Sequence, residues 1–471
     1  MKRFTALFLA CLLLMFMTIT GCDKVNDNSS SSNITSSKSV DDAKNTVSVA
    51  TVTNNPNDKV INVYSFTEEV PMIITRYKEL HPDFPYEIKY IYPGESSYPP
   101  FLDQALTTGG ADAPDIYCVE SAYALKYTQG DEYQYAAPYK DLGIDIDNLL
   151  KEADTAQYSV DIGTNSDGKL VGLSFQATGG AFIYRRSIAK SVWGTDKPAA
   201  IQDKIGPGWD KFFAAAADLK AKGYGIVSGD GDIWHSIENS SDKPWIVDGK
   251  LYIDPKREAF LDYSKKLKEN GFDNNTQDWT DAWYADMKGA GKQQIFGFFG
   301  PAWLICYVMS NNSGGDKIGE GTYGDWAVCE PPVGFFWGGT WILANKNTKN
   351  KTAVGDIIKW ITLDSSDTGL QYYWANGTEY GTGGVKDSVT SGTVMKKSNG
   401  ELDFLDGQNM FDIFYPAGKL ATGKNMTLYD GTINSFWRDQ VREYTEGNKT
   451  KKQAIEDFKK NVKNNLNIVA E

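Results

Sequence analysis

The stretch IFGFFGPAWLICYVMSNNSGGDKIGEGTYGDWAVCEPPVGFFWGGTWILANKN, residues 295–347, carries four of the thirteen tryptophans of the 471-residue chain. Its pattern predicts an apolar strand over 295–299, a Gly-Pro turn, a helix that opens at 302–303, and two strands over 326–329 and 340–344. Three of its tryptophans follow a Gly or a Pro within two or three positions: Trp303, Trp337 and Trp341.

An aromatic ring beside glycine has no neighbouring side chain to cover it, so its flat face can stay accessible. Such a face suits stacking on a flat, partly apolar ligand such as a pyranose ring. The alternative is that these tryptophans belong to the core, because tryptophan buries a large apolar area. For each tryptophan alone both roles stay open, whereas the set as a whole favours ligand stacking.

The first 21 residues are interpreted as a leader that is removed from the mature protein. Lys2 and Arg3 precede an apolar run over 4–17, and Ile-Thr-Gly then leads directly into Cys22. This arrangement resembles the lipobox of bacterial lipoproteins and predicts lipidation (palmitate) at Cys22. The alternative is an ordinary signal peptide with an accidental cysteine. Residues 22–58, rich in Ser, Asn, Asp and Thr, predict a flexible tether after the lipidated cysteine.

Composition limits the classes of ligand. The formal net charge is −13 and aromatic residues make up 13% of the chain. An acidic surface disfavours nucleic acids and phosphate-rich ligands and suits a neutral ligand. Only two histidines, His81 and His235, and no C-x-x-C spacing disfavour a metal site, a disulfide framework and a Ser-His-Asp hydrolase. No metal and no cofactor is therefore expected.

Short β-branched strands alternate with amphipathic helices between residues 60 and 127. The strands are predicted over 60–65, 86–92 and 115–120, and the helices over 71–80, 101–106 and 121–127. This alternation predicts a parallel sheet. Ligands of such sheets gather beyond the carboxyl ends of the strands, where Glu68 and Glu120 lie.

The rest of the chain predicts a second, helix-rich lobe, because about 410 residues exceed one ordinary domain. A strand over 171–175, a polar segment and AFIYRRSI suggest a crossover between the lobes. Residues 226–234 predict a strand and then a turn whose acids, Asp230 among them, face a ligand. Further helices are predicted over 209–222, 258–270, 279–288, 353–362, 435–445 and 451–466.

The ordered series of motifs resembles the extracellular solute-binding proteins, family 1 type, of carbohydrate ABC importers. The motifs are VINVYSF (60–66), TTGGADAPDIYCVE (107–120), FIYRRSI (182–188), FFGPAW (298–303) and WAVCEPPV through GGTWILANKNTKN (326–350). The resemblance covers about residues 59–470. It implies an α/β, two-lobed, periplasmic-binding-protein-like fold, similar to that of maltose-binding proteins, with the ligand cleft between the lobes.

The resemblance also implies lobe boundaries and crossing segments. The first lobe would comprise residues 59–175 and 333–378, and the second lobe residues 176–332 and 379–471. The hinge would cross near 174–176, 331–333 and 372–377.

Aromatic residues for stacking and short polar side chains for sugar hydroxyls are typical of this family. Carried over by position, the implied ligand-binding residues are Glu68, Glu120, Gln176, Asp230, Trp234, Trp283, Trp303, Trp337 and Trp341. For each polar residue, a helix cap or a solvated loop is the alternative role.

The resemblance implies a non-enzymatic protein, lipid-anchored on the extracellular face of the bacterial cell membrane. It would capture an oligosaccharide and deliver it to the permease subunits of an ABC transporter. The many tryptophans favour a β-linked gluco- or xylo-oligosaccharide, such as a cellodextrin, over an α-glucan.

Two other classes remain open. A glycoside hydrolase would need two carboxylates about 5–10 Å apart, which Glu68, Glu120 and Asp230 could supply. A cell-surface glycan-adhesion lipoprotein would bind sugar without delivering it to a permease.

Overall fold

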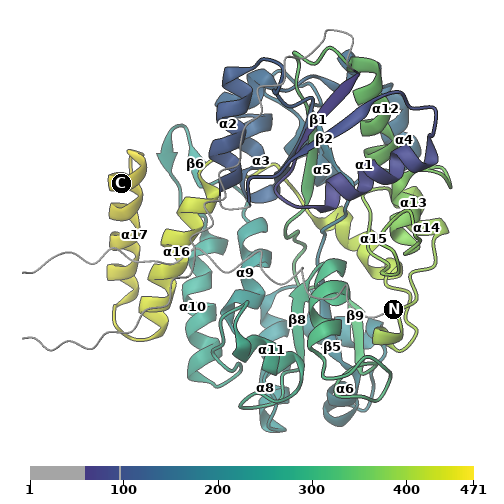
Figure 1. The fold of residues 1–471 in the computed structure, drawn as a ribbon. Coiled ribbons are helices and arrows are strands. Elements are labelled where there is room, and N and C mark those ends of the chain that lie inside the picture. The colour runs from purple at the N-terminus through teal and green to yellow at the C-terminus, as the bar shows by residue number, and fades with distance from the viewer. Residues whose placement is uncertain (1–58, 95–96, 471) are drawn as a thin grey trace, which may run out of the picture. The chain divides into compact units, whose positions relative to one another are not determined.

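A computed structural model of the chain describes residues 59–94 and 97–470 (Figure 1). Residues 60–471 form one compact unit, distinct from residues 1–59. The predicted signal peptide, Cys22 and the tether up to residue 58 lie outside the described residues. Within the described ranges, every helix is too short or too polar to cross a membrane.

The first sheet has five strands in the order β2-β1-β3-β10-β4. These are β1 (Val60–Tyr64), β2 (Glu87–Ile91), β3 (Ile116–Glu120), β4 (Gly172–Ser174) and β10 (Thr340–Ala344). β1 pairs in parallel with β2 and β3, so the predicted parallel sheet is confirmed for these strands. β10 runs antiparallel to both β3 and β4. Helices α1 (Glu69–Leu80) and α2 (Tyr98–Thr108) connect the parallel strands.

The second sheet has three strands, with β5 (Ala181–Arg185) between β8 (Gly297–Gly300) and β9 (Trp326–Cys329). Isolated parallel bridges extend it from Ile295 to Gly225 and from Val227 to Asp273. Figure 1 shows helices α6 and α8 near this sheet and α1 and α12 near the first. Buried apolar residues form two clusters: one covers the first sheet and one face of the second sheet, and the other covers the opposite face of the second sheet.

Most predicted helices are confirmed to within a few residues. The helices around the two sheets are α3 (Ser121–Thr128), α4 (Ile146–Ala153), α5 (Gln157–Gly163), α6 (Arg186–Trp193), α7 (Pro198–Ile205), α8 (Trp209–Ala221), α9 (Asp230–Asn239), α10 (Pro255–Glu269), α11 (Asp281–Met287), α12 (Lys351–Thr362), α13 (Leu370–Ala375), α14 (Gly392–Lys397), α15 (Phe411–Leu420), α16 (Asp430–Thr445) and α17 (Lys451–Leu466). A small hairpin joins β6 (Ile246–Val247) to β7 (Lys250–Leu251).

The predicted turn at residues 230–232 is wrong, because Asp230 begins helix α9. The Asp232 carboxylate accepts hydrogen bonds from the backbone N–H groups of Ser228 (2.8 Å) and Gly229 (3.1 Å). An acid three residues after the cap satisfies donors that a helix start leaves unpaired. Asp232 is therefore a capping residue, and Asp230 lies in the first turn of a helix.

Two of the three predicted crossing segments join the sheets. Residues 175–180 lead from β4 to β5, and residues 330–339 lead from β9 to β10. The third, 372–377, falls on α13 and its C-terminal end, and α13 packs against α12 and α14. A different helix, α15, contacts both parts of the fold: it packs against α5, beside the first sheet, and against β5 of the second sheet. The lobe boundaries stay a prediction, although α14 contacts α4, an element of the predicted first lobe.

Candidate ligand-binding site

Four rings from separate segments form an aromatic cluster: Trp279, Trp303, Trp337 and His235. Trp279 and Trp303 are nearly parallel, at 12° with ring centroids 6.1 Å apart. Trp337 meets Trp303 edge-on at 4.8 Å and Trp279 at 5.8 Å. His235 stacks on Trp337 at 4.2 Å and 22°. All four side chains are half-buried, so the cluster keeps ring surface exposed to solvent.

The cluster gathers residues that follow strands or cross between sheets. Trp303 comes three residues after β8, and its indole N–H donates to the Trp337 carbonyl at 3.1 Å. Trp337 lies in the segment between β9 and β10, and His235 lies on α9. Gly338 (φ 77°) lies against this contact, since a Cβ there would be in van der Waals contact, 3.7 Å from the Trp303 indole nitrogen and 3.9 Å from a Glu120 carboxylate oxygen.

Two members of the cluster, His235 and Trp279, are absent from the predicted ligand-binding residues, and Trp279 is the more unusual of the two. Its backbone is left-handed (φ 64°), a conformation that costs a bulky residue about 1–2 kcal/mol. Thr280 fixes this bend: its hydroxyl donates to the Gln277 carbonyl at 2.7 Å and accepts from the Trp283 N–H at 3.4 Å. A strained, non-glycine residue with exposed ring surface points to a functional role. The sequence signal was Thr280-Asp281, an N-cap and first helical residue that start the helix two residues later than the predicted position 279.

A polar group lies at the junction of α1, the first crossing segment and the residues before α14. The Gln176 amide donates to a Glu69 carboxylate oxygen at 3.4 Å. Asp387 is 2% exposed and accepts from the Ser388 N–H at 2.7 Å. Burial raises the pKa of Glu69 to about 8, with Asp387 adding repulsion, and burial raises the pKa of Asp387 to about 7. Burial raises the pKa of Tyr307, and the charges of Asp387 and Glu69 raise it further.

Residues 72–401 match the family of bacterial extracellular solute-binding proteins. The chain belongs to this family. Curated proteins give no match. Among solved structures, one of an extracellular solute-binding protein family 1 member is 18% identical, with a TM-score of 0.69 over 85% of this chain and 97% of that chain.

Two further solved structures, of ABC transporter binding proteins, are similar to this solute-binding protein. One from B. animalis subsp. lactis Bl-04, in complex with beta-1,6-galactobiose, is 18% identical with a TM-score of 0.57 and covers 86% of this chain and 97% of that one. One from Listeria monocytogenes, in complex with cycloalternan, is 14% identical with a TM-score of 0.60 and covers 88% and 100%. These likenesses confirm the predicted α/β fold of the maltose-binding-protein type.

Four of the predicted site residues of this solute-binding protein lie in or beside these two groups. Trp303 and Trp337 are in the aromatic cluster, and Gln176 is in the polar group. Glu120 borders the cluster at Gly338; its carboxylate accepts from the Ala122 N–H (2.6 Å) and from the Ser121 hydroxyl (2.9 Å). It therefore also caps α3, the alternative role that the sequence left open.

Three predicted stacking residues are core residues instead. Trp341, Trp283 and Trp234 are 0%, 1% and 2% exposed, so none can offer a ring face to a ligand. The Trp341 indole donates to the Ser159 carbonyl at 3.1 Å, and that of Trp283 to Asp232 at 3.2 Å. Trp234 packs on Phe260 at 4.9 Å.

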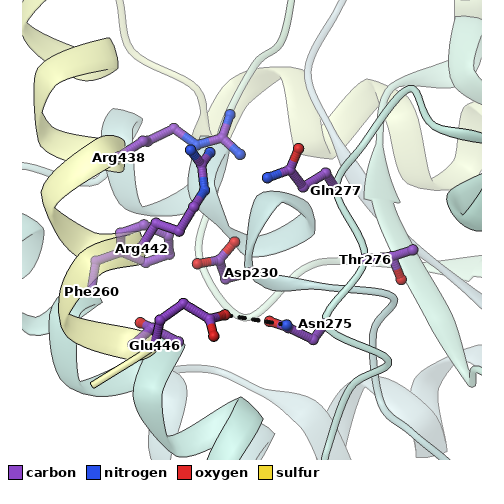
Figure 2. A pocket seen from close by; sticks show the side chains of 9 residues that line it. Asp230, Phe260, Asn275, Thr276, Gln277, Arg438, Arg442 and Glu446 are labelled. Atoms are coloured by element: carbon purple, nitrogen blue, oxygen red, sulfur yellow. Dashed lines mark hydrogen bonds between the residues drawn. The ribbon is translucent and has the colours of Figure 1, made fainter. Parts of the chain in front are cut away.

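Two predicted acids belong to neither the polar group nor the aromatic cluster. Glu68 is exposed at the start of α1, where its neighbour Glu69 contacts Gln176. Asp230 accepts from the Ser264 hydroxyl at 2.5 Å and lines a pocket between α10 and α16 (Figure 2).

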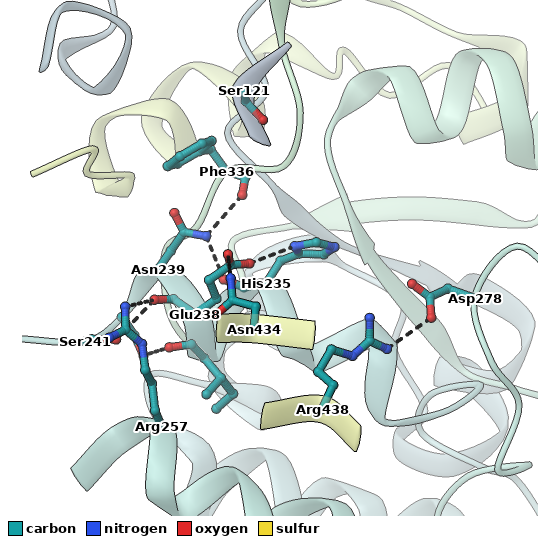
Figure 3. A network of polar contacts seen from close by, with 12 residues as sticks. Ser121, His235, Glu238, Asn239, Ser241, Arg257, Asp278, Phe336, Asn434 and Arg438 are labelled. Carbon is teal, nitrogen blue, oxygen red and sulfur yellow. Dashed lines mark hydrogen bonds and ion pairs between the residues drawn. The ribbon is translucent and has the colours of Figure 1, made fainter. Parts of the chain in front are cut away.

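A polar network behind the cluster positions His235 and Trp337 (Figure 3). The Glu238 carboxylate lies 3.4 Å from Nδ1 of His235. The Asn239 amide donates to the carbonyls of His235 (2.9 Å) and Phe336 (3.2 Å), which ties α9 to the segment that carries Trp337. Asn434 donates to the second oxygen of Glu238. These contacts hold the stacked pair in place.

The site is suited to binding a neutral polar molecule by stacking and hydrogen bonding. Between residues 59 and 470, leaving out 95 and 96, no three His, Cys, Asp or Glu side chains are placed to hold a metal ion.

The raised pKa values predict how stability depends on pH. Glu69 and Asp387 bind protons more tightly in the folded than in the unfolded protein, so folding takes up protons between their ordinary and their raised pKa values. The free energy of unfolding is therefore expected to fall as the pH rises from about 5 to about 8. Urea unfolding across this range should show the decline, and the double variant Glu69→Gln, Asp387→Asn should make it less steep. Part of the decline should remain, because burial also raises the pKa values of Asp232, Asp273 and Asp430. An unchanged pH profile in that variant would contradict the assignment.

Proposed function

We propose that this solute-binding protein captures a neutral oligosaccharide and delivers it to the permease subunits of an ABC importer. The observation that carries the proposal is the aromatic cluster, in which half-buried tryptophans lie beside side chains that bind hydroxyl groups. A pyranose ring has an apolar face that stacks on indole and a rim of hydroxyls. Glu120, Gln176 and Glu69 offer acceptors and donors for that rim.

Similar structures support a sugar as the ligand. The structures described above hold beta-1,6-galactobiose and cycloalternan, and others of the same fold hold lacto-N-biose and acarbose. Their linkages differ, so the fold by itself favours no single sugar. The near-parallel rings of Trp279 and Trp303 suit successive units of an extended chain. We therefore take a β-linked gluco- or xylo-oligosaccharide such as a cellodextrin as the first candidate.

Binding would proceed by closure of the two lobes. The polar group includes Gln176, on the segment that leads from the first sheet to the second, and Trp337 lies on the segment that returns. A ligand that touches both lobes binds the closed arrangement better and shifts the population toward it. The closed form would then dock on the permease.

The protein is proposed to act at the outer face of the cell membrane, held by a lipid on Cys22. The Ile-Thr-Gly-Cys motif after an apolar run supports this, as does the polar tether that follows. Release of a Cys22→Ser variant from the membrane fraction is the expected result, and retention there would contradict the anchor.

The test is isothermal titration of the mature protein, residues 22–471, with cellotriose, xylotriose, maltotriose, laminaritriose and glucose. Saturable one-to-one binding of one linkage, with no product after overnight incubation, is expected. Product formation would instead establish the glycan-cleaving alternative. If no sugar binds, a sugar transport function is contradicted. Binding without uptake in a strain that carries the intact permease would favour the adhesion alternative.

A further inference from the structure

A polar pocket lies beside the aromatic cluster, and none of the stacking residues lines it. Figure 2 shows it between α10, α16 and the loop before α11, with the side chains of Asp230, Gln277, Arg438 and Arg442 pointing into it. Asn275 and Glu446 close it on the opposite side, and the Asn275 amide donates to Glu446 at 3.4 Å. Its lining is polar apart from Phe260, which is fully buried.

The strand pattern places this pocket at the same edge of the second sheet as the aromatic cluster. The segments at 225–227 and 273 run parallel to the chain at Ile295, which leads into β8. Parallel segments end at one edge of a sheet, so Trp303 after β8, Asp230 after 227 and the loop 274–279 share that edge. Gln277 precedes Trp279 by two residues, a span of at most about 7 Å of chain. The pocket therefore lies next to the aromatic cluster along this edge of the sheet.

The charges in the pocket are paired, which favours a neutral ligand group. Arg438 donates to Asp278 at 3.2 Å, and Arg442 to Asp439 at 3.4 Å. Glu446 forms an ion pair with Lys268. The Arg438–Asp278 pair depends on Gly231, since a Cβ there would lie 2.6 Å from the Asp278 carboxylate. No guanidinium is left without a carboxylate for an anionic group to neutralise.

The side chains that line the pocket combine donors and acceptors in planar groups. Two guanidiniums and two amides donate, while the Asp230 and Glu446 carboxylates accept. Planar groups of this kind match neighbouring hydroxyls, which are both donors and acceptors. An ionic ligand would need a pocket lining with a surplus of the opposite charge. An apolar ligand would leave these polar groups unpaired.

We propose that this pocket binds a further sugar unit of the oligosaccharide, beyond the units stacked at Trp279 and Trp303. This inference rests on the proposed function and adds that the ligand is a chain long enough to reach α16. The unit is held by hydrogen bonds to Gln277, Arg442 and Asp230 rather than by stacking. The preferred ligand is consequently longer than the cluster alone would select.

The test is a chain-length series measured by calorimetry on the mature protein. The probes are β-1,4-linked gluco-oligosaccharides of two to six units, with the xylo- and α-1,4-gluco-series in parallel. We expect Gln277→Ala and Arg442→Gln to bind the shortest ligand as the wild type does. For the longest ligand of the series that binds, each variant should lose about tenfold in affinity, the loss of one hydrogen bond to a charged or polar group.

A matched control is Lys451→Gln, which removes the ion pairs of Lys451 with Glu258 and Asp262 outside the pocket. It should leave affinity unchanged at every length. Wild-type affinity of both pocket variants for the longest ligand would overturn the pocket while leaving the proposed function intact. An equal loss at every length would also overturn it, because it would indicate a general structural effect. If the wild type binds no series, the proposed function fails and the pocket assignment fails with it.

Discussion

Replacement of Trp303 by alanine is expected to weaken sugar binding by about 1–3 kcal/mol, or about 5- to 150-fold, because it removes a stacking surface. Trp303 is half-buried, contacts both Trp279 and Trp337, and donates its indole N–H to the Trp337 carbonyl. Its loss would also free Trp337 to move. Calorimetric titration of the variant with the sugar that the wild type binds best measures the effect.

Trp193→Ala is the matched control for Trp303→Ala. Trp193 is also half-buried, but it lies at the end of α6 and packs on Phe296, with its indole N–H bonded to Asp218 at 3.0 Å. Its removal should leave sugar affinity unchanged. Should Trp303→Ala fold and bind sugar as tightly as the wild type, Trp303 would be excluded from the ligand site.

Replacement of Trp341 by alanine is expected to lower the free energy of unfolding by about 3–5 kcal/mol, the cost of emptying a large core position. Trp341 has no exposed surface and lies on β10, between β3 and β4. The change also leaves the Ser159 carbonyl without the indole donor that it now accepts from at 3.1 Å. Urea unfolding followed by circular dichroism measures the loss.

Trp341→Phe separates packing from ligand contact. Phenylalanine keeps most of the buried ring area and should cost less stability than alanine, with no change in sugar affinity. A Trp341→Phe variant of wild-type stability that no longer binds sugar would show that Trp341 contacts the ligand after all.

Local sequence patterns were enough to predict most helices and strands. The strands predicted over 60–65 and 115–120 are present as β1 (60–64) and β3 (116–120). Helix periodicity also predicted α17 over the residues that it occupies, 451–466. These signals are local, because periodicity and capping depend on neighbours within a turn or two. Where a cap was not recognised, the prediction failed. The carboxylate of Asp232 caps the start of α9, where the sequence predicted a turn.

Which tryptophans are core and which keep an exposed face depends on how distant elements pack together. Trp337 and Trp341 lie four residues apart, and each follows a glycine within three positions. Trp337 is nevertheless half-buried in a crossing segment, whereas Trp341 is fully buried on a central strand. The same holds for the acids: Glu69, not its neighbour Glu68, contacts Gln176, a residue 107 positions away. Exposure and distant contacts depend on how separate elements pack, and a one-residue shift along a helix or strand turns a side chain to another face.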